Sequence, residues 1–244
     1  MWASIEEVVK PESFAETLEY LHRPGSILFA GGSYLVAKKD SEIRTLLDIN
    51  HLLNDEISSI DGEIHVGAGC NFQKLVRFDN TSLSHAIIRS CPSKNIRNQR
   101  TLGGEIAQSR SDSDLLVYLF AAQTKVRIHG SVELIPISDW RSKGIITDLI
   151  IPQDPVQMER VSVLDSAPAY VIVGVKQIGE SISIAVGGKT NRILACSTEL
   201  RPDEAQIRQL MDNVKSLFQD DHFGNTDYKQ HIVSKLLQEM VVIK

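Results

Sequence analysis

The chain contains few cysteines, and their positions exclude the sites that depend on clustered thiols. Its 244 residues include three cysteines, Cys70, Cys91 and Cys196, and no two of them form a C-x-x-C pair. This spacing predicts neither a disulfide framework nor an iron–sulfur or zinc site within the chain. The seven histidines show no H-x-H or H-E-x-x-H spacing, so we expect no metal ligands.

The chain also lacks a net positive charge and a long apolar run. Its formal net charge is -5 at pH 7, which argues against a nucleic-acid partner because such proteins usually carry a basic stripe. No apolar run approaches the roughly 20 residues of a membrane span, and the start of the chain is acidic where a signal peptide is basic. We therefore expect a cytoplasmic protein that holds any anionic ligand by local backbone geometry.

Two glycine pairs stand beside apolar runs, each with a neighbouring hydroxyl residue. The first lies in Ala30-Gly31-Gly32-Ser33-Tyr34-Leu35 and the second in Thr101-Leu102-Gly103-Gly104-Glu105-Ile106. A diphosphate requires several backbone N–H groups at short range, and glycine allows that approach and the positive φ angles of such turns. Ser33 and Thr101 add hydroxyl donors. Together the pairs predict a two-sided diphosphate cradle.

Other glycine and serine motifs fit known sites poorly. Gly67-Ala68-Gly69 is the only G-x-G, and Phe72 occupies the position of the third glycine of a dinucleotide-binding fingerprint. The segment 187–190 imitates the end of a phosphate-binding P-loop, but Ser183 replaces its first glycine. No G-x-S-x-G elbow is present. A Rossmann-type nicotinamide site and hydrolysis are both disfavoured, and no residue is a candidate for catalysis.

Asp114 stands where an apolar helix is expected to begin, ten residues beyond Gly104. One interpretation is an N-cap carboxylate that stabilises the helix. The other is a carboxylate that accepts hydrogen bonds from a ribose or adenine group. Both roles are compatible.

The apolar periodicity predicts an α+β protein with a boundary near Pro152 and Pro155. Before the boundary, helices are expected at 11–21, 71–78 and 114–122, and 93–100 is expected to be a loop that leads into the second glycine pair. Strands are expected at 27–29, 45–49, 63–66, 125–129, 132–137 and 145–151. Beyond the boundary, three strands at 170–176, 182–186 and 193–197 precede two helices, which indicates a separate α+β domain. The last helix has an apolar stripe of Tyr228, Ile232, Leu236 and Met240.

The glycine segments and their surroundings resemble the flavin subunit of molybdenum hydroxylases. This group includes the medium subunit of carbon monoxide dehydrogenase and the central domain of xanthine dehydrogenase. The resemblance rests on 30–35, on Ile96-Arg97-Asn98-Gln99-Arg100 leading into 101–107, and on Ser109 and Asp114. It extends over nearly the whole chain, through 149–152 and 182–188 to Thr226-Asp227-Tyr228-Lys229.

The resemblance implies an FAD-binding domain over residues 1–153, of the p-cresol methylhydroxylase and vanillyl-alcohol oxidase type. This domain comprises two α/β subdomains that divide near residue 53, and residues 154–244 form a C-terminal α+β domain of the carbon monoxide dehydrogenase flavoprotein type, with a three-stranded antiparallel sheet and helices. Residues 30–35, 101–102 and Gly103-Gly104 would surround the FAD diphosphate. Asp114 would contact the cofactor, and Ile146 would lie near the flavin ring.

The chain departs from the family at three places, one of which is Arg110-Ser111-Asp112-Ser113, where the family usually has small and proline residues before the aspartate. Glu105 follows the second glycine pair where the family usually has Asn, and a carboxylate there would repel a diphosphate unless it is turned away or protonated. A basic residue that many relatives place near the flavin has no clear equivalent in 161–169. These departures motivate an alternative, a non-redox assembly subunit that has lost FAD.

The leading hypothesis is an FAD-binding electron-transfer subunit of an oxidoreductase. Its partners would be an iron–sulfur small subunit and a molybdopterin large subunit that oxidises the substrate, which fits the lack of metal ligands in this chain. Three electron acceptors are compatible with the sequence: NAD, a quinone and a protein. A free-standing flavin oxidase would require a substrate pocket with a base, and the sequence offers no candidate.

Overall fold

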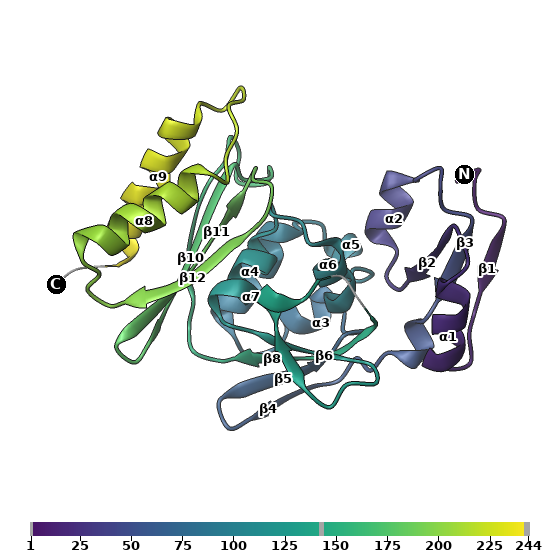
Figure 1. Cartoon of the computed structure of the whole chain (residues 1–244). Helices are drawn as coiled ribbons and strands as arrows, with labels where there is room; N and C mark the ends of the chain where they lie inside the picture. The colour runs from purple at the N-terminus through teal and green to yellow at the C-terminus, as the bar shows by residue number, and fades with distance from the viewer. Residues whose placement is uncertain (1, 142–143, 242–244) are drawn as a thin grey trace.

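Three β-sheets, arranged in chain order, organise the protein (Figure 1). The computed structural model describes residues 2–141 and 144–241. Figure 1 shows the N-terminal, central and C-terminal groups of elements as three neighbouring parts, each with its own helices. This architecture confirms the α+β class that the sequence predicts.

The N-terminal sheet is parallel, with the strand order β1-β3-β2. Ser13 caps the first helix by accepting a hydrogen bond from the Glu16 N–H at 3.2 Å, and Gly25 follows that helix with a φ of +77°. The elements are β1 (Glu7–Val9), α1 (Phe14–Leu21), β2 (Ser26–Phe29), α2 (Ser33–Lys38) and β3 (Thr45–Asp48). The predicted helix and strands of this part are confirmed.

The central sheet is antiparallel, with the strand order β4-β5-β8-β6-β7. Asp61 and Gly62, with φ angles of 50° and 79°, make the two-residue turn between its first two strands. The strands are β4 (Ile57–Ile60), β5 (Glu63–Gly67), β6 (Lys125–Ile128), β7 (Leu134–Pro136) and β8 (Ile146–Pro152), and short 3₁₀ helices occur at Asn50–Leu52 and Ile137–Asp139.

Five helices connect β5 to β6 and pack with the central sheet into the largest apolar core. They are α3 (Phe72–Val76), α4 (Thr81–Ser90), α5 (Lys94–Arg97), α6 (Leu102–Gln108) and α7 (Asp114–Ala121). The prediction of a loop over 93–100 is wrong at its centre, where α5 forms. The second glycine pair lies inside α6, because the Thr101 hydroxyl caps that helix and accepts from the Gly104 N–H.

The C-terminal sheet has four antiparallel strands in the order β12-β11-β10-β9. Its elements are β9 (Gln157–Val161), β10 (Val171–Ile178), β11 (Ser181–Gly188), β12 (Leu194–Glu199), α8 (Glu204–Lys215) and α9 (Thr226–Met240). The sequence predicts three of these strands. Edge strand β9 was missed because its residues are only partly buried and alternate weakly. Within the described residues, no helix is long and apolar enough to cross a bilayer.

Helix α9 packs most of the predicted stripe against the C-terminal core: Ile232, Leu236 and Met240 are partly buried there, whereas Tyr228 is 49% exposed. The residues that α9 buries most fully are Lys229, Val233 and Leu237. The Lys229 ammonium is enclosed completely, and it donates to the Gln219 carbonyl at 2.7 Å. It also pairs with Asp221 at 2.8 Å. A lysine is thus part of the buried face because the preceding loop supplies both of its oxygen partners.

Replacing this lysine tests how much the buried pairing contributes. We expect Lys229→Met to lower the free energy of unfolding by about 1–3 kcal/mol, because the Gln219 carbonyl loses its charged donor. Lys229 also lowers the pKa of Asp221, so the difference from wild type narrows as the pH falls below about 4. Urea unfolding measures both effects. Lys235→Met, an exposed change on the same helix, should stay close to wild type, and an equal loss in both variants would contradict the assignment.

Candidate functional site

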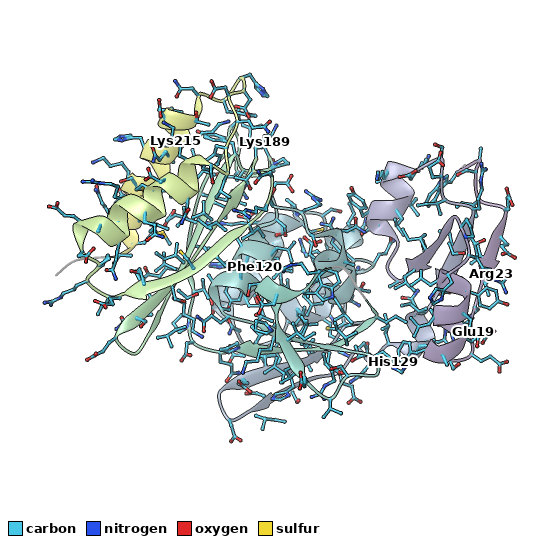
Figure 2. The ribbon with its side chains drawn as sticks, in the orientation of Figure 1. Glu19, Arg23, Phe120, His129, Lys189 and Lys215 are labelled. Atoms are coloured by element: carbon cyan, nitrogen blue, oxygen red, sulfur yellow. The ribbon has the colours of Figure 1, made fainter. Side chains whose placement is uncertain are left out.

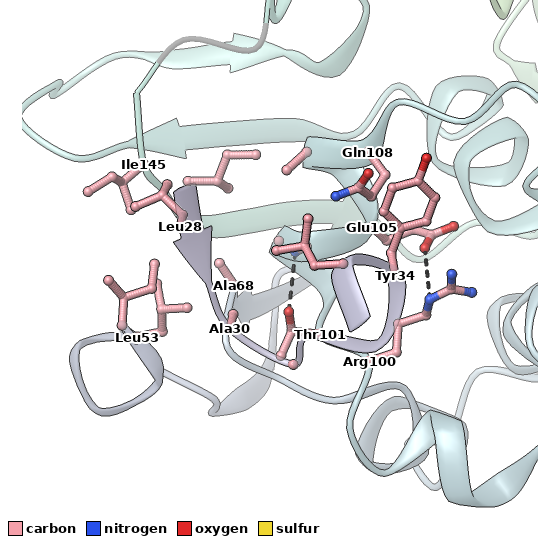
Figure 3. Close-up of a pocket in the computed structure, with 18 of the residues that line it drawn as sticks. Leu28, Ala30, Tyr34, Leu53, Ala68, Arg100, Thr101, Glu105, Gln108 and Ile145 are labelled. Atoms are coloured by element: carbon pink, nitrogen blue, oxygen red, sulfur yellow. Dashed lines mark hydrogen bonds and ion pairs between the residues drawn. The ribbon is translucent and has the colours of Figure 1, made fainter. Parts of the chain in front are cut away.

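A cavity lies between the N-terminal part and the helices of the central part (Figure 3). Its volume is about 750 Å³, including the space in its open mouth. Both glycine segments contribute to its wall, together with the first residue of β8. The predicted residues that line it are Ala30, Gly31, Gly32, Ser33, Tyr34, Leu35, Thr101, Gly103, Gly104 and Ile146. Leu102 and Asp114 do not line it.

The first glycine pair is required by close packing of the loop between β2 and α2. A Cβ on Gly31 would clash with the carbonyl oxygen of Gln99, so this loop touches the approach to the second pair. Gly32 has a φ of +64°, and a Cβ there would clash with the Phe29 ring. Only this glycine of the four adopts the positive φ expected for the cradle.

The same loop presents a row of unpaired backbone donors. No oxygen in the described part of the chain accepts from the N–H groups of residues 31–35. Those of Ser33, Tyr34 and Leu35 belong to the first turn of α2, which has no intrahelical acceptors for them. Successive N–H groups of this kind form a concavity suited to an anion.

The second glycine pair uses its donors within the protein. The Leu102 N–H donates to the Cys70 carbonyl and the Gly103 N–H to the Ala68 carbonyl, both at 2.9 Å. The Gly104 N–H donates to the Thr101 hydroxyl oxygen at 3.3 Å. A Cβ on Gly103 would crowd Ala68, so this glycine allows α6 to pack on the segment after β5. The structure therefore corrects the expected two-sided cradle. Unpaired backbone donors line the cavity at residues 31–35, whereas the N–H groups of residues 102–104 are used within the protein.

Glu105, which stands where the resemblance expects Asn, has partners that hold its carboxylate. The side chain is 1% exposed. Its Oε1 accepts from the Ser113 hydroxyl at 2.5 Å, and Oε2 lies 3.3 Å from Arg100 Nε as an ion pair outside hydrogen-bond geometry (Figure 3). Arg100 therefore balances the charge that would otherwise repel a diphosphate.

Asp114 lies away from the cavity and pairs with an arginine of the C-terminal sheet. Its Oδ2 is 3.2 Å from Arg160 Nη1, and both side chains are almost fully buried. Burial raises the pKa of Asp114, while Arg160 and Arg89 oppose that rise. The cap of α7 is Ser113, which accepts from the Leu116 N–H at 3.2 Å, so the N-cap interpretation of Asp114 is one residue out. The observed contact joins the central and C-terminal parts.

Leu102 is the second predicted residue outside the cavity, because its fully buried side chain belongs to the central core. Sequence reasoning also missed several residues of the wall. Several apolar side chains line the cavity: Leu28, Ile49, Leu53, Trp140 and Ile145. Figure 3 shows Leu28, Leu53 and Ile145 at the end of the cavity away from Arg100 and Glu105. An apolar lining with a few placed polar groups suits a largely aromatic ligand. No local signal identifies these residues, since they come from three separate stretches of the chain: β2, the connection that follows β3, and the segment that precedes β8.

The comparisons with known proteins agree with this geometry. Residues 3–153 match the family described as the FAD binding domain in molybdopterin dehydrogenase. The chain belongs to this family. Its cofactor is FAD, and the chain is an oxidoreductase component of the molybdenum hydroxylase type. The resemblance recognised from the glycine segments is confirmed.

Individual relatives of this FAD-binding chain match along nearly their whole length. The Escherichia coli K12 protein YgfM, described as uncharacterized, is 26% identical, and the match covers 97% of this chain and 95% of YgfM. A reconstituted carbon monoxide dehydrogenase from Oligotropha carboxidovorans has a chain of 16% identity and TM-score 0.72. The match covers 97% of the present chain and 96% of that chain. Quinoline 2-oxidoreductase from Pseudomonas putida 86 has a chain of 16% identity and TM-score 0.71. This match covers 99% of the present chain and 97% of the other chain. At these identities the two structures establish a shared fold.

Proposed function

We propose that the chain is the FAD-binding electron-transfer subunit of a molybdopterin-dependent dehydrogenase complex. The row of unpaired N–H groups at 31–35 carries the proposal, because it lies in the cavity wall within the matched FAD-binding domain. These donors suit a diphosphate, and the apolar end of the cavity suits a flavin ring. The residues present therefore fit FAD.

Within this proposal, each side of the cavity has a separate task. The amides of 31–35 and the Ser33 hydroxyl bind the diphosphate, and the Gly31 contact with Gln99 keeps that loop in place. Apolar side chains such as Leu53 and Ile146 exclude water from the ring. Bound FAD supplies electron transfer in single or paired steps. No acid–base group of this chain is required.

The partners follow from a division of labour across subunits. We assign substrate oxidation to a molybdopterin large subunit and delivery of electrons to an iron–sulfur small subunit. The described residues contain no group of three or more potential metal ligands, and we assign such clusters to the partner subunits. Bound FAD would supply the electron transfer to an acceptor, and NAD, a quinone and a protein are the three alternatives for that acceptor. We assign cofactor binding to residues 1–153, with its two subdomains dividing near residue 53, and the supporting α+β domain to 154–244.

Titration of the purified full chain with FAD tests the cofactor assignment. We expect one equivalent of FAD to bind, with quenching of flavin fluorescence and a resolved flavin absorbance band. Riboflavin, which lacks the diphosphate, should bind more weakly because the donors at 31–35 have no anion to contact. A folded chain that binds no FAD would support the alternative of an assembly subunit without cofactor.

Isolation of the chain from its native cell tests the partner assignment. We expect co-purification of one protein with C-x-x-C-rich iron–sulfur motifs and one that binds molybdopterin. Recovery of the flavin-loaded chain alone, with turnover of a substrate, would favour a free-standing oxidase and contradict the assignment.

A further inference from the structure

Arg100 is a cationic side chain held at the cavity wall, one residue before the second glycine segment. It lines the cavity, and its side chain is 12% exposed. The backbone is fixed on both sides: the Arg100 N–H donates to the Ile96 carbonyl at 2.8 Å, and the Arg100 carbonyl accepts from the Phe72 N–H at 2.9 Å. Helix α5 and the first residue of α3 thus fix the backbone position from which this guanidinium extends.

The guanidinium is held along one edge. Nε faces the Glu105 carboxylate at 3.3 Å, and the Ser113 hydroxyl holds that carboxylate from its other oxygen. Cζ lies 5.7 Å from the centre of the Phe72 ring. Figure 3 shows this edge of Arg100 turned to Glu105, with Tyr34 beside them.

The other edge of the guanidinium has no oxygen partner among the described residues, but Arg100 lies near the Cys91 thiol and opposes the rise that burial causes in the pKa of that thiol. No carbonyl, carboxylate or hydroxyl oxygen of the described residues accepts a hydrogen bond from Nη1 or Nη2, and neither atom is sealed from solvent. Two parallel N–H groups on a planar fork match the oxygens of a phosphate. The backbone donors of the neighbouring glycine segment are already used, as described above.

We propose that Arg100 binds the diphosphate of the cofactor alongside residues 31–35, and that Glu105 orients it. This inference rests on the proposed FAD function and adds a ligand that the resemblance does not assign. Arg100 replaces the missing backbone donors of the second segment. Glu105 holds its Nε, so that the paired donors of the other edge are available to the anion.

Four variants separate binding by Arg100 from simple charge balance. In Arg100→Met, we expect FAD affinity to fall about tenfold to hundredfold, the range for a lost charge-assisted hydrogen bond. Arg100→Met/Glu105→Asn removes the unpaired carboxylate as well and should recover only part of that loss. Glu105→Asn alone should lower affinity by about threefold to tenfold, less than Arg100→Met, because Arg100 keeps its charge but loses the carboxylate that orients it. Lys94→Met, which removes an exposed cation outside the cavity wall, should leave affinity unchanged.

The measurements are FAD titration by fluorescence quenching and thermal unfolding of each apo variant, which shows that it is folded. Full recovery of wild-type affinity in the double variant would overturn the proposal, because Arg100 would then serve only as the counter-ion of Glu105. Unchanged affinity in Arg100→Met would overturn it as well. Absence of FAD binding by folded wild-type protein would instead contradict the proposed function, so the two failures are distinguishable.

Discussion

Gly31→Ala is expected to weaken FAD binding by about 100-fold and to lower the free energy of unfolding by about 3 kcal/mol. The atoms that an added Cβ would meet are the carbonyl of Gln99 and the amide nitrogen of Thr101. These are backbone atoms, so no side-chain rotation relieves the clash. The first loop must therefore move away from the second segment, and its row of N–H groups loses the position that an anion requires.

Gly62→Ala is the matched control for this change. Gly62 lies in the turn between β4 and β5, and a Cβ there has open space around it. Its φ of 79° makes the substitution cost about 1 kcal/mol of backbone strain, but FAD affinity should not change. Titration with FAD and urea unfolding are the two measurements. Wild-type FAD affinity in Gly31→Ala would mean that contact between the segments does not position the cofactor site.

The sequence identifies the glycine segments but not the reasons for each glycine. A glycine pair indicates a close approach or a positive φ; Gly31 satisfies the first condition and Gly32 satisfies both. The partner of Gly31 lies nearly seventy residues along the chain, so spacing alone cannot predict it. Gly103 instead serves helix packing, because a capping threonine two residues earlier turns the segment into the start of α6. Local composition favoured a loop, and tertiary packing favoured the helix.

The ion pairs of Glu105 and Asp114 are a second case in which the sequence pattern does not predict the contacts of a residue. Glu105 reads from the sequence as a repulsive departure from its family, since nothing in the linear pattern connects it with Arg100 and Ser113. The pairing arises because α6 completes its first turn over residue 100 and because Ser113 precedes α7. Asp114 likewise stands out as a carboxylate at a helix start, but its partner Arg160 comes from β9, the strand that the apolar periodicity does not reveal. The first error concerns contacts with nearby residues that depend on where α6 and α7 begin, and the second concerns a contact between segments far apart in sequence.

This buried pair of Asp114 and Arg160 supports the second large prediction. We expect Arg160→Met to lower the free energy of unfolding by about 3–5 kcal/mol at pH 7, because it leaves the Asp114 carboxylate buried without its cation. Burial already raises the pKa of Asp114, and Arg160 opposes that rise, so the variant raises the pKa further. A carboxyl whose folded-state pKa lies above its unfolded value binds its proton more tightly when folded. The loss should therefore be largest at pH 7 and shrink toward pH 5.

Asp114→Asn/Arg160→Met completes the test, because it replaces both charges by neutral groups of similar size. Urea unfolding should show recovery of most of the lost stability and little dependence on pH between about 5 and 7, since no buried carboxylate remains. An unchanged stability in Arg160→Met would mean that the ion pair does not join the two parts of the fold. FAD titration of the stable double variant then separates two roles: affinity within about twofold of wild type assigns Asp114 to the interface with β9. A larger loss would support the cofactor contact that the family resemblance implies.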